Sequence, residues 1–210
     1  MKTITLEEID QLDKRYRTNL INCLSGIKSV NLIGTKSKDG QENLAVFNSV
    51  IHLGANPPLM GFVQRPDSVE RHTFENIQNT SFFTINAVTE EIHKQAHQTA
   101  ARYDRSENEF EEVSLQSVSI NGFYAPFVAK SPLKIGLECV DIIPIPINNT
   151  QLVIGKVKLI HLDESYLKED GFLSLSEQGV VGGTGLDSYL STEEIGRYSY
   201  AKPDRSLENI

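Results

Sequence analysis

Basic side chains and a hydroxyl group cluster in the sequence between residues 65 and 73. Arg71, His72 and Thr73 begin a segment whose apolar spacing predicts a short helix over residues 72–79, and Arg65 lies shortly before it. The first backbone N–H groups of a helix have no partner inside the helix, so they attract anions. A cation and a hydroxyl group at such a helix start predict a binding site for a phosphate group.

Plainer structural roles are open to each of these residues. Arg71 can be a solvated surface side chain, and Arg65 can form an ion pair at the end of a strand. Thr73 can cap the helix, with or without also binding an anion. The sequence by itself leaves both interpretations open.

The familiar nucleotide-binding loops and hydrolase motifs are missing from the sequence. No Walker motif occurs, and no G-x-G-x-x-G follows a predicted strand, so we do not expect a P-loop or a Rossmann crevice. A hydrolase built from Ser49, Asp67 and His72 lacks a nucleophile-elbow sequence. The glycine-rich segment 179–185 resembles a phosphate cradle only in composition, and we predict a flexible turn there.

Two further groups of polar residues invite a chemical interpretation. His93 and His97 are four residues apart on a predicted helix, which is a spacing that metal ligands use. Because no third ligand lies at a suitable offset, we expect no metal site and interpret the pair as surface residues or as the edge of a pocket. The acidic run over residues 107–112 is interpreted as a solvated loop rather than a catalytic carboxylate pair.

The composition narrows the class of protein. The chain has 210 residues with 39% hydrophobic content and a net charge of −8, which suits a single domain over residues 1–210 and argues against nucleic-acid binding. Cys23 and Cys139 match no redox or zinc motif. Neither a signal-peptide core nor an apolar run long enough to span a bilayer is found. We therefore expect a cytoplasmic protein with reduced thiols and no membrane partner.

Strand signals dominate the chain. Strands are predicted at 29–35, 43–53, 59–64, 81–88, 116–121, 131–143 and 151–161, and helices at 5–24, 72–79 and 89–103. Thr5 is the expected cap of the first helix, and Lys38-Asp39-Gly40 is the expected turn of a hairpin. Many strands at short spacing with a few inserted helices favour a small β-barrel.

Several sequence blocks, taken in order, resemble the flavin reductase-like family. They are NLAVFNS (43–49), NPPLMGF (56–62), RHTFENI (71–77), FFTINAV (82–88), SENEFEE (106–112), APFVAKSPLKIGLEC (125–139) and LVIGKV (152–157). This resemblance implies a mainly β (α+β) fold, an FMN-binding split β-barrel of Greek-key-like topology with a few peripheral helices. The barrel would cover about residues 23–200, with the N-terminal helix and the C-terminal tail outside it.

The same resemblance implies a homodimer with FMN in a groove between the subunits. Its implied contacts are Asn48, Ser49 and Val50 at the flavin ring, Arg65 near the ring or phosphate, Arg71, His72 and Thr73 at the phosphate, Asn86 and Ala87 beside the ring, Gln98 and Thr99 from the next helix, and Tyr198 and Tyr200 across the dimer. Val46 replaces a common Pro, and His72 a common Asp. Asn48 and Ser49 can instead satisfy a bulge in a strand.

The implied activity is that of an NAD(P)H-dependent flavin oxidoreductase. Hydride would pass from NADH or NADPH to bound FMN and on to an acceptor such as free flavin, with no catalytic side chain required. One alternative is a flavoredoxin-like electron carrier that a partner protein reduces. Another is a ligand-binding barrel that has lost its flavin. The sequence does not distinguish NADH from NADPH, and it does not identify the acceptor.

Overall fold

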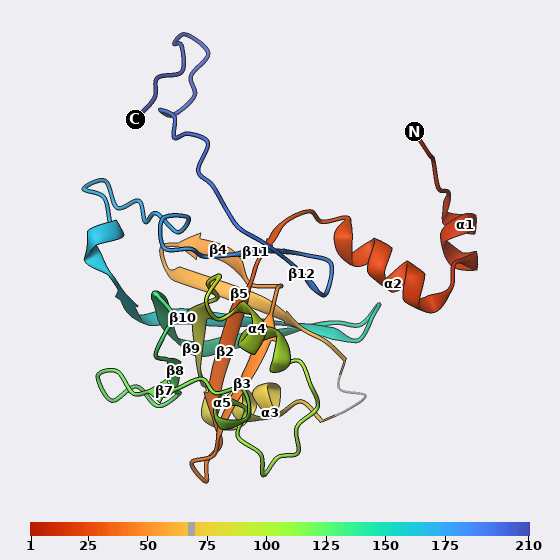
Figure 1. The fold of residues 1–210 in the computed structure, drawn as a ribbon, viewed down its shortest axis with the longest axis vertical. Helices are drawn as coiled ribbons and strands as arrows, with labels where there is room; N and C mark the ends of the chain where they lie inside the picture. Colours follow the sequence, from red (N-terminus) through yellow and green to blue (C-terminus); the bar gives the residue numbers. More distant parts are fainter. Residues whose placement is uncertain (67–69) are drawn as a thin grey trace.

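Seven antiparallel strands form one curved sheet in the computed structural model, which describes residues 1–66 and 70–210. The strand order is β3-β2-β6-β9-β10-β5-β4 (Figure 1). Asp67 and Ser68 of the expected Pro-Asp-Ser turn lie outside the described residues. The bounds are β2 Asn31–Lys36, β3 Glu42–Phe47, β4 Ile51–Ala55, β5 Pro58–Gln64, β6 Phe82–Ala87, β9 Leu133–Ile145 and β10 Thr150–Leu162.

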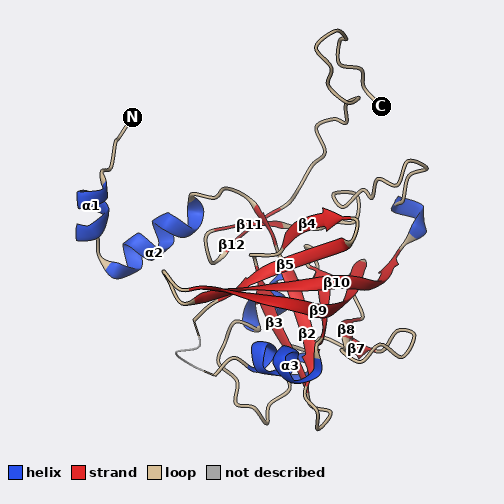
Figure 2. Ribbon diagram, turned by 180° about the vertical axis from the view of Figure 1, so that it is seen from behind, coloured by secondary structure: helices blue, strands red, loops and turns tan. Residues whose placement is uncertain are grey.

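The two edges of this sheet meet where β3 leads into β4. The Phe47 ring on β3 packs edge-on against Phe62 on β5, with centroids 4.9 Å apart. The Ser49 hydroxyl donates to the Val63 carbonyl (3.1 Å) and accepts from the Val63 N–H (3.2 Å). The contacts of Phe47 and Ser49 with β5 therefore close the curled sheet into a barrel. Figure 2 shows the strands of this sheet.

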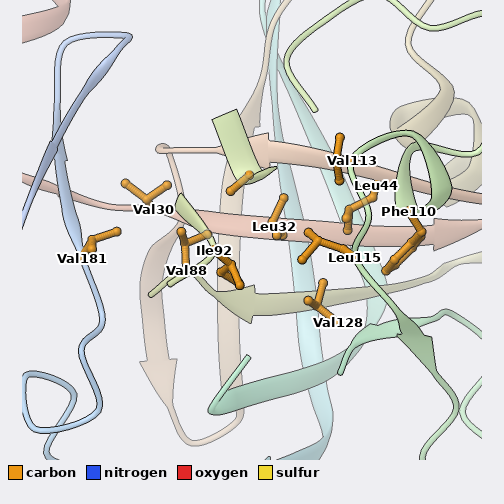
Figure 3. Close-up of a cluster of buried hydrophobic side chains, with 11 residues drawn as sticks. Val30, Leu32, Leu44, Val88, Ile92, Phe110, Val113, Leu115, Val128 and Val181 are labelled. Carbon is orange, nitrogen blue, oxygen red and sulfur yellow. The ribbon is translucent and has the colours of Figure 1, made fainter. Parts of the chain in front are cut away.

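Alternating residues of the sheet supply two separate cores, as the period of two in a strand requires. On β2, Ile33 belongs to an inner cluster with the buried Phe62 and Phe83, and α3 (His72–Thr80) adds Phe74 and Ile77 to it. The neighbouring Leu32 belongs to an outer cluster, drawn in Figure 3, whose members are Val30, Leu32, Leu44, Val88, Ile92, Ala96, Phe110, Val113, Leu115, Val128 and Val181.

Short elements cover the outer cluster and the rim of the barrel. They are α4 (His93–Gln98), α5 (Glu109–Glu112), η1 (Glu164–Tyr166), the pair β7 (Ser117–Val118) and β8 (Phe127–Val128), and the sheet β1 (Lys28–Ser29), β11 (Gly182–Thr184) and β12 (Ser188–Leu190). The flexible turn predicted over 179–185 is wrong for its second half, because β11 pairs with β1. A Cβ on Gly183 would lie 2.7 Å from the Val30 side chain, so only glycine permits this close packing.

The N-terminal arm, residues 1–27, projects away from the barrel (Figures 1 and 2). The single helix predicted over 5–24 is in fact two, α1 (Leu6–Gln11) and α2 (Lys14–Cys23), because Leu12 is extended and Asp13 caps the second helix. The predicted cap at Thr5 is confirmed as a capping box with Glu8. Neither helix contains a buried residue. Among the described residues, no helix is long and apolar enough to cross a membrane.

Three other predicted elements differ from the structure. The strand expected at 43–53 is interrupted at residues 48–50, where the barrel closes. The helix expected at 89–103 is reduced to α4. Thr89 pairs with Val180 instead, and the residues beyond Thr99 are not helical. The loop expected over the acidic run contains α5, whose first residue, Glu109, is buried. Each difference depends on contacts between segments that are distant in the sequence.

Candidate anion and flavin site

The start of α3 has unpaired backbone donors. Arg71 occupies the N-cap position and makes no side-chain capping bond. Within the described part of the chain, the N–H groups of His72, Thr73 and Phe74 have no acceptor, as expected for the first turn of an uncapped helix. These donors and the helix dipole together favour an anion at this position.

Three arginines surround this helix start. Burial lowers the pKa of Arg71, and the charges of Arg65 and Arg102 lower it further. Arg71 Nε donates to the Pro66 carbonyl at 3.2 Å. No carboxylate in residues 1–66 or 70–210 forms an ion pair with any of the three. A chain with a net charge of −8 therefore gathers three basic side chains near one point.

The other two predicted phosphate ligands are placed differently. Thr73 is buried, and its hydroxyl is hydrogen-bonded to the Asn43 amide at 2.9 Å. What it offers to a ligand is therefore its backbone N–H. His72 is half-buried, and its Nε2 lies 3.4 Å from Glu70 Oε2.

Residues 48–50 form a second group of unpaired donors at the other end of β3. The Asn48 amide donates to the Gly185 carbonyl at 2.8 Å, and Ser49 is held by Val63. Their side chains are thus used within the protein. The three backbone N–H groups of 48–50 have no acceptor among the residues that the structure describes, and all three residues are partly exposed. Partly exposed donors of this kind are available to a ligand or to water.

The two donor groups are separated by the length of β3. Thr73 contacts Asn43 near the start of the strand, and Asn48 follows its end. At about 3.4 Å per residue, the distance from Asn43 to Asn48 is roughly 17 Å. An extended mononucleotide with a large ring can cover such a distance, with its phosphate at α3 and its ring at residues 48–50.

Three of the predicted ring contacts lie inside the protein instead. Asn86 is fully buried, and its amide donates to the Leu32 carbonyl and to Thr84 while its oxygen accepts from the Val128 N–H. Ala87 is buried beside it, and the Thr99 hydroxyl is buried and bonded to the Ala96 carbonyl. The side chains of Asn86, Ala87 and Thr99 are therefore buried, and the polar groups of Asn86 and Thr99 are bonded within the protein.

The remaining predicted contacts, Gln98, Tyr198 and Tyr200, are exposed. Gln98 lies on α4 and donates to the Tyr103 hydroxyl at 3.2 Å. Tyr198 forms a bridge with Asn209 inside the C-terminal tail, and Tyr200 is almost fully exposed there. Figure 1 shows this tail leaving the barrel, so within one chain these tyrosines do not reach the start of α3.

Sequence reasoning missed Arg102 and Glu109. Arg102 follows α4, and its only signal in the sequence is a basic residue just before a strongly acidic stretch. Glu109 was included in a solvated run, yet its carboxylate accepts the Leu44 N–H at 3.1 Å in the interior. Of the two histidines, His97 has its Nδ1 at 3.0 Å from the Tyr189 hydroxyl. The described residues contain no cluster of three or more metal ligands.

Comparison with known proteins agrees with the sequence blocks. Residues 27–177 match the family described as "Flavin reductase like domain". A solved structure from Shewanella frigidimarina NCIMB 400, described as a candidate flavin reductase with a split barrel domain, is 45% identical with a TM-score of 0.93. That match covers 96% of this chain and 100% of the other.

Two more distant structures share the fold. Nitrilotriacetate monooxygenase component B from Bacillus cereus is 22% identical with a TM-score of 0.79, over 92% of this chain and 96% of that one. Flavoredoxin of Desulfovibrio vulgaris (Miyazaki F) is 22% identical with a TM-score of 0.69, over 85% and 92%. The predicted split barrel is thereby confirmed, and the chain belongs to the flavin reductase-like family.

Proposed function

We propose that this protein binds FMN and acts as an NAD(P)H-dependent flavin oxidoreductase. The observation that carries the proposal is the cluster of Arg65, Arg71 and Arg102 at the uncapped start of α3. Three guanidinium groups without an ion pair in residues 1–66 and 70–210, together with the N–H groups of the first helical turn, suit a phosphate monoester, which carries close to two negative charges at neutral pH. Family membership makes FMN the expected source of that phosphate.

The donor set at both ends of β3 fits FMN. The arginines and the N–H groups of His72 and Thr73 would hold the phosphate. The N–H groups of residues 48–50 would donate to the polar edge of the ring, which leaves Asn48 and Ser49 to fix the loop through Gly185 and Val63. Asn86, Ala87 and Thr99 would act behind the site as structural residues.

FMN supplies the hydride chemistry when it is bound, so the protein's task is positioning. Backbone donors fixed by the barrel can stabilise negative charge on a ring edge without reorganising during the reaction. The arginine cluster anchors the other end of the ligand, which limits the motion of the ring. No side-chain nucleophile or general base is needed, and we assign none.

We also propose that the chain, one domain over residues 1–210, is a homodimer with the site at its interface. Apolar side chains remain exposed on three strands of the large sheet, two of them adjacent: Ile51 and Leu53 on β4, Val140 and Ile143 on β9, and Ile160 on β10. The arm adds exposed Leu6, Tyr16 and Leu24. Exposed apolar surface of this extent favours association. Tyr198 and Tyr200 of a second copy would then be the tail residues near the ring.

A visible absorption spectrum tests the proposed function. Purified protein is mixed with FMN under anaerobic conditions, and NADH or NADPH is then added. We expect a bound-flavin spectrum that bleaches with at least one nucleotide. Bound flavin that stays oxidised with both would favour the electron-carrier alternative, in which a partner protein supplies the electrons. Absence of any FMN binding would contradict the proposal.

A further inference from the structure

Two hydrogen bonds of the same kind fasten α3 to the sheet. Near its start, Thr73 is bonded to Asn43 of β3 at 2.9 Å. One turn later, Asn76 donates to Thr35 of β2 at 3.1 Å. All four residues are buried. The first bond fixes the turn that presents the free N–H groups, whereas the second fixes the middle of the helix.

Only the first of these bonds continues into a network. With its amide nitrogen facing Glu109, Asn43 donates to Glu109 Oε1 at 3.2 Å while its oxygen accepts from the Thr73 hydroxyl at 2.9 Å. This orientation is required when Glu109 is ionised, because a carboxylate can only accept hydrogen bonds. Asn43 thus joins the start of α3 to the first residue of α5.

The segment that ends at Glu109 also carries Arg102. Glu109 accepts the Leu44 N–H at 3.1 Å, which fixes α5 against β3. Arg105, between the two, is paired with Glu75 on α3. Residues 102–109 are therefore held at both α3 and β3, so the position of Arg102 depends on the same anchors as the position of Thr73.

We propose that Asn43 is a positioning residue of the anion site, tying the start of α3 and the Arg102 segment to β3 through Thr73 and Glu109. It is buried, and its side chain is bonded to Thr73 and Glu109. The inference rests on the proposed function, since it names the residue that aligns the phosphate-binding groups. Its loss misaligns several donors at once and leaves the ring end of β3 in place.

The test compares a flavin that has the phosphate with one that lacks it. Dissociation constants of FMN and riboflavin are measured for wild type, Asn43→Ala and Thr73→Val by flavin fluorescence. We expect the FMN constant to rise about tenfold in both variants, as one or two lost hydrogen bonds would give, with riboflavin binding within about twofold of wild type. Thr73→Val preserves shape, so it tests the link even if Asn43→Ala folds poorly.

Asn76→Ala is the matched control. It removes a similarly buried asparagine, on α3 instead of β3, and its bond to a threonine, but it does not touch the network to Glu109. We expect a similar loss of thermal stability with an unchanged ratio of riboflavin to FMN constants. The proposal is overturned if Asn76→Ala lowers that ratio as much as Asn43→Ala, or if Asn43→Ala and Thr73→Val weaken both flavins equally.

Failure of the proposed function gives a different pattern. Wild-type protein would then bind neither flavin, or would bind both with the same constant, before any variant is compared. Either result removes the phosphate site and with it the role of Asn43. A wild-type preference for FMN that survives Asn43→Ala and Thr73→Val would remove only the positioning role.

Discussion

The barrel and the N-terminal arm differ in how far their side chains are buried. In the barrel, Phe62, Phe83, Leu32 and Ile33 are completely buried by contacts within one chain. In the arm, α1 and α2 have good capping residues, yet neither helix buries a side chain. Helices this short are marginally stable in water on their own. The difference teaches that the barrel is packed within one chain, whereas one chain leaves the apolar side chains of the arm exposed.

The largest effect is expected from Phe62→Ala. Its ring packs against Phe47 and Phe83 inside the barrel, so truncation should lower the free energy of unfolding by about 3–5 kcal/mol. Chemical denaturation followed by circular dichroism measures this loss at several protein concentrations. Tyr16→Ala on α2 is the comparison.

Tyr16→Ala should cost less, and its cost should depend on protein concentration. Tyr16 is more than half exposed in one chain, at 56%, so its remaining contacts would come from a second copy. The Phe62→Ala loss should be the same at every concentration. Equal, concentration-independent losses for both variants would contradict the distinction between barrel and arm.

Arg71→Ala and Arg102→Ala test whether the barrel itself carries the ligand site. Each removes a charge-assisted contact, so FMN binding should weaken by about 1.5–3 kcal/mol while riboflavin binding changes little. Isothermal titration measures both. Lys130→Ala, which removes an exposed cation paired with Glu91, should leave FMN binding unchanged. If Lys130→Ala has the same effect as Arg102→Ala, the attraction is a general charge effect.

The buried Glu109 should make stability fall as the pH rises. Burial raises its pKa above the ordinary value, against the lowering effects of the Leu44 N–H and of His72. The folded state therefore holds a proton that the unfolded state releases first, and the free energy of unfolding decreases between the ordinary and the raised pKa. One pH unit within that interval is worth up to about 1.4 kcal/mol.

Glu109→Gln removes this titration. As the pH rises from 4.5, the melting temperature of the variant should increase relative to that of wild type. Above the raised pKa of Glu109, the difference between the two should stay constant. Glu111→Gln, an exposed neighbour on α5, should follow wild type throughout. A constant difference between Glu109→Gln and wild type across the whole range would show that Glu109 does not titrate in this way.

The smallest effect on the barrel itself is expected from removal of residues 1–24. The free energy of unfolding of dilute protein should change by less than about 0.5 kcal/mol, because neither α1 nor α2 contains a buried residue. Sedimentation should nevertheless show a shift from twice 23.4 kDa for the full-length protein to the mass of a single shortened chain for the variant at micromolar concentration. A full-length chain that already sediments at 23.4 kDa would contradict the dimer.

Local signals in the sequence were enough to predict α3 and the arginine at its start. Short-range spacing, turn residues and caps predict most strands, the start of α3 and the arginine there. The family resemblance supplied the split barrel. Thr5 and Gly40 also do what their local context predicts, as a helix cap and a turn residue with positive φ.

The remaining features depend on contacts between distant residues. The predicted strand is interrupted at residues 48–50 because Ser49 bonds to Val63 and Asn48 bonds to Gly185. The burial of Glu109 depends on Leu44, which is 65 residues away in the sequence. A run of glutamates has the same local pattern whether or not one of them lies inside, so no periodicity could reveal it.

The Asn48–Gly185 hydrogen bond has a consequence for synthesis. Its partners are 137 residues apart, whereas Asn43, Thr73, Arg102 and Glu109 all lie within the first half or just beyond it. A chain emerging from the ribosome thus has every component of the phosphate end long before Gly185 is made. Because distant contacts also form slowly, the loop at the ring end is the last part of the site to be fixed. The nascent protein therefore acquires the groups proposed to hold the phosphate well before the loop proposed to hold the ring.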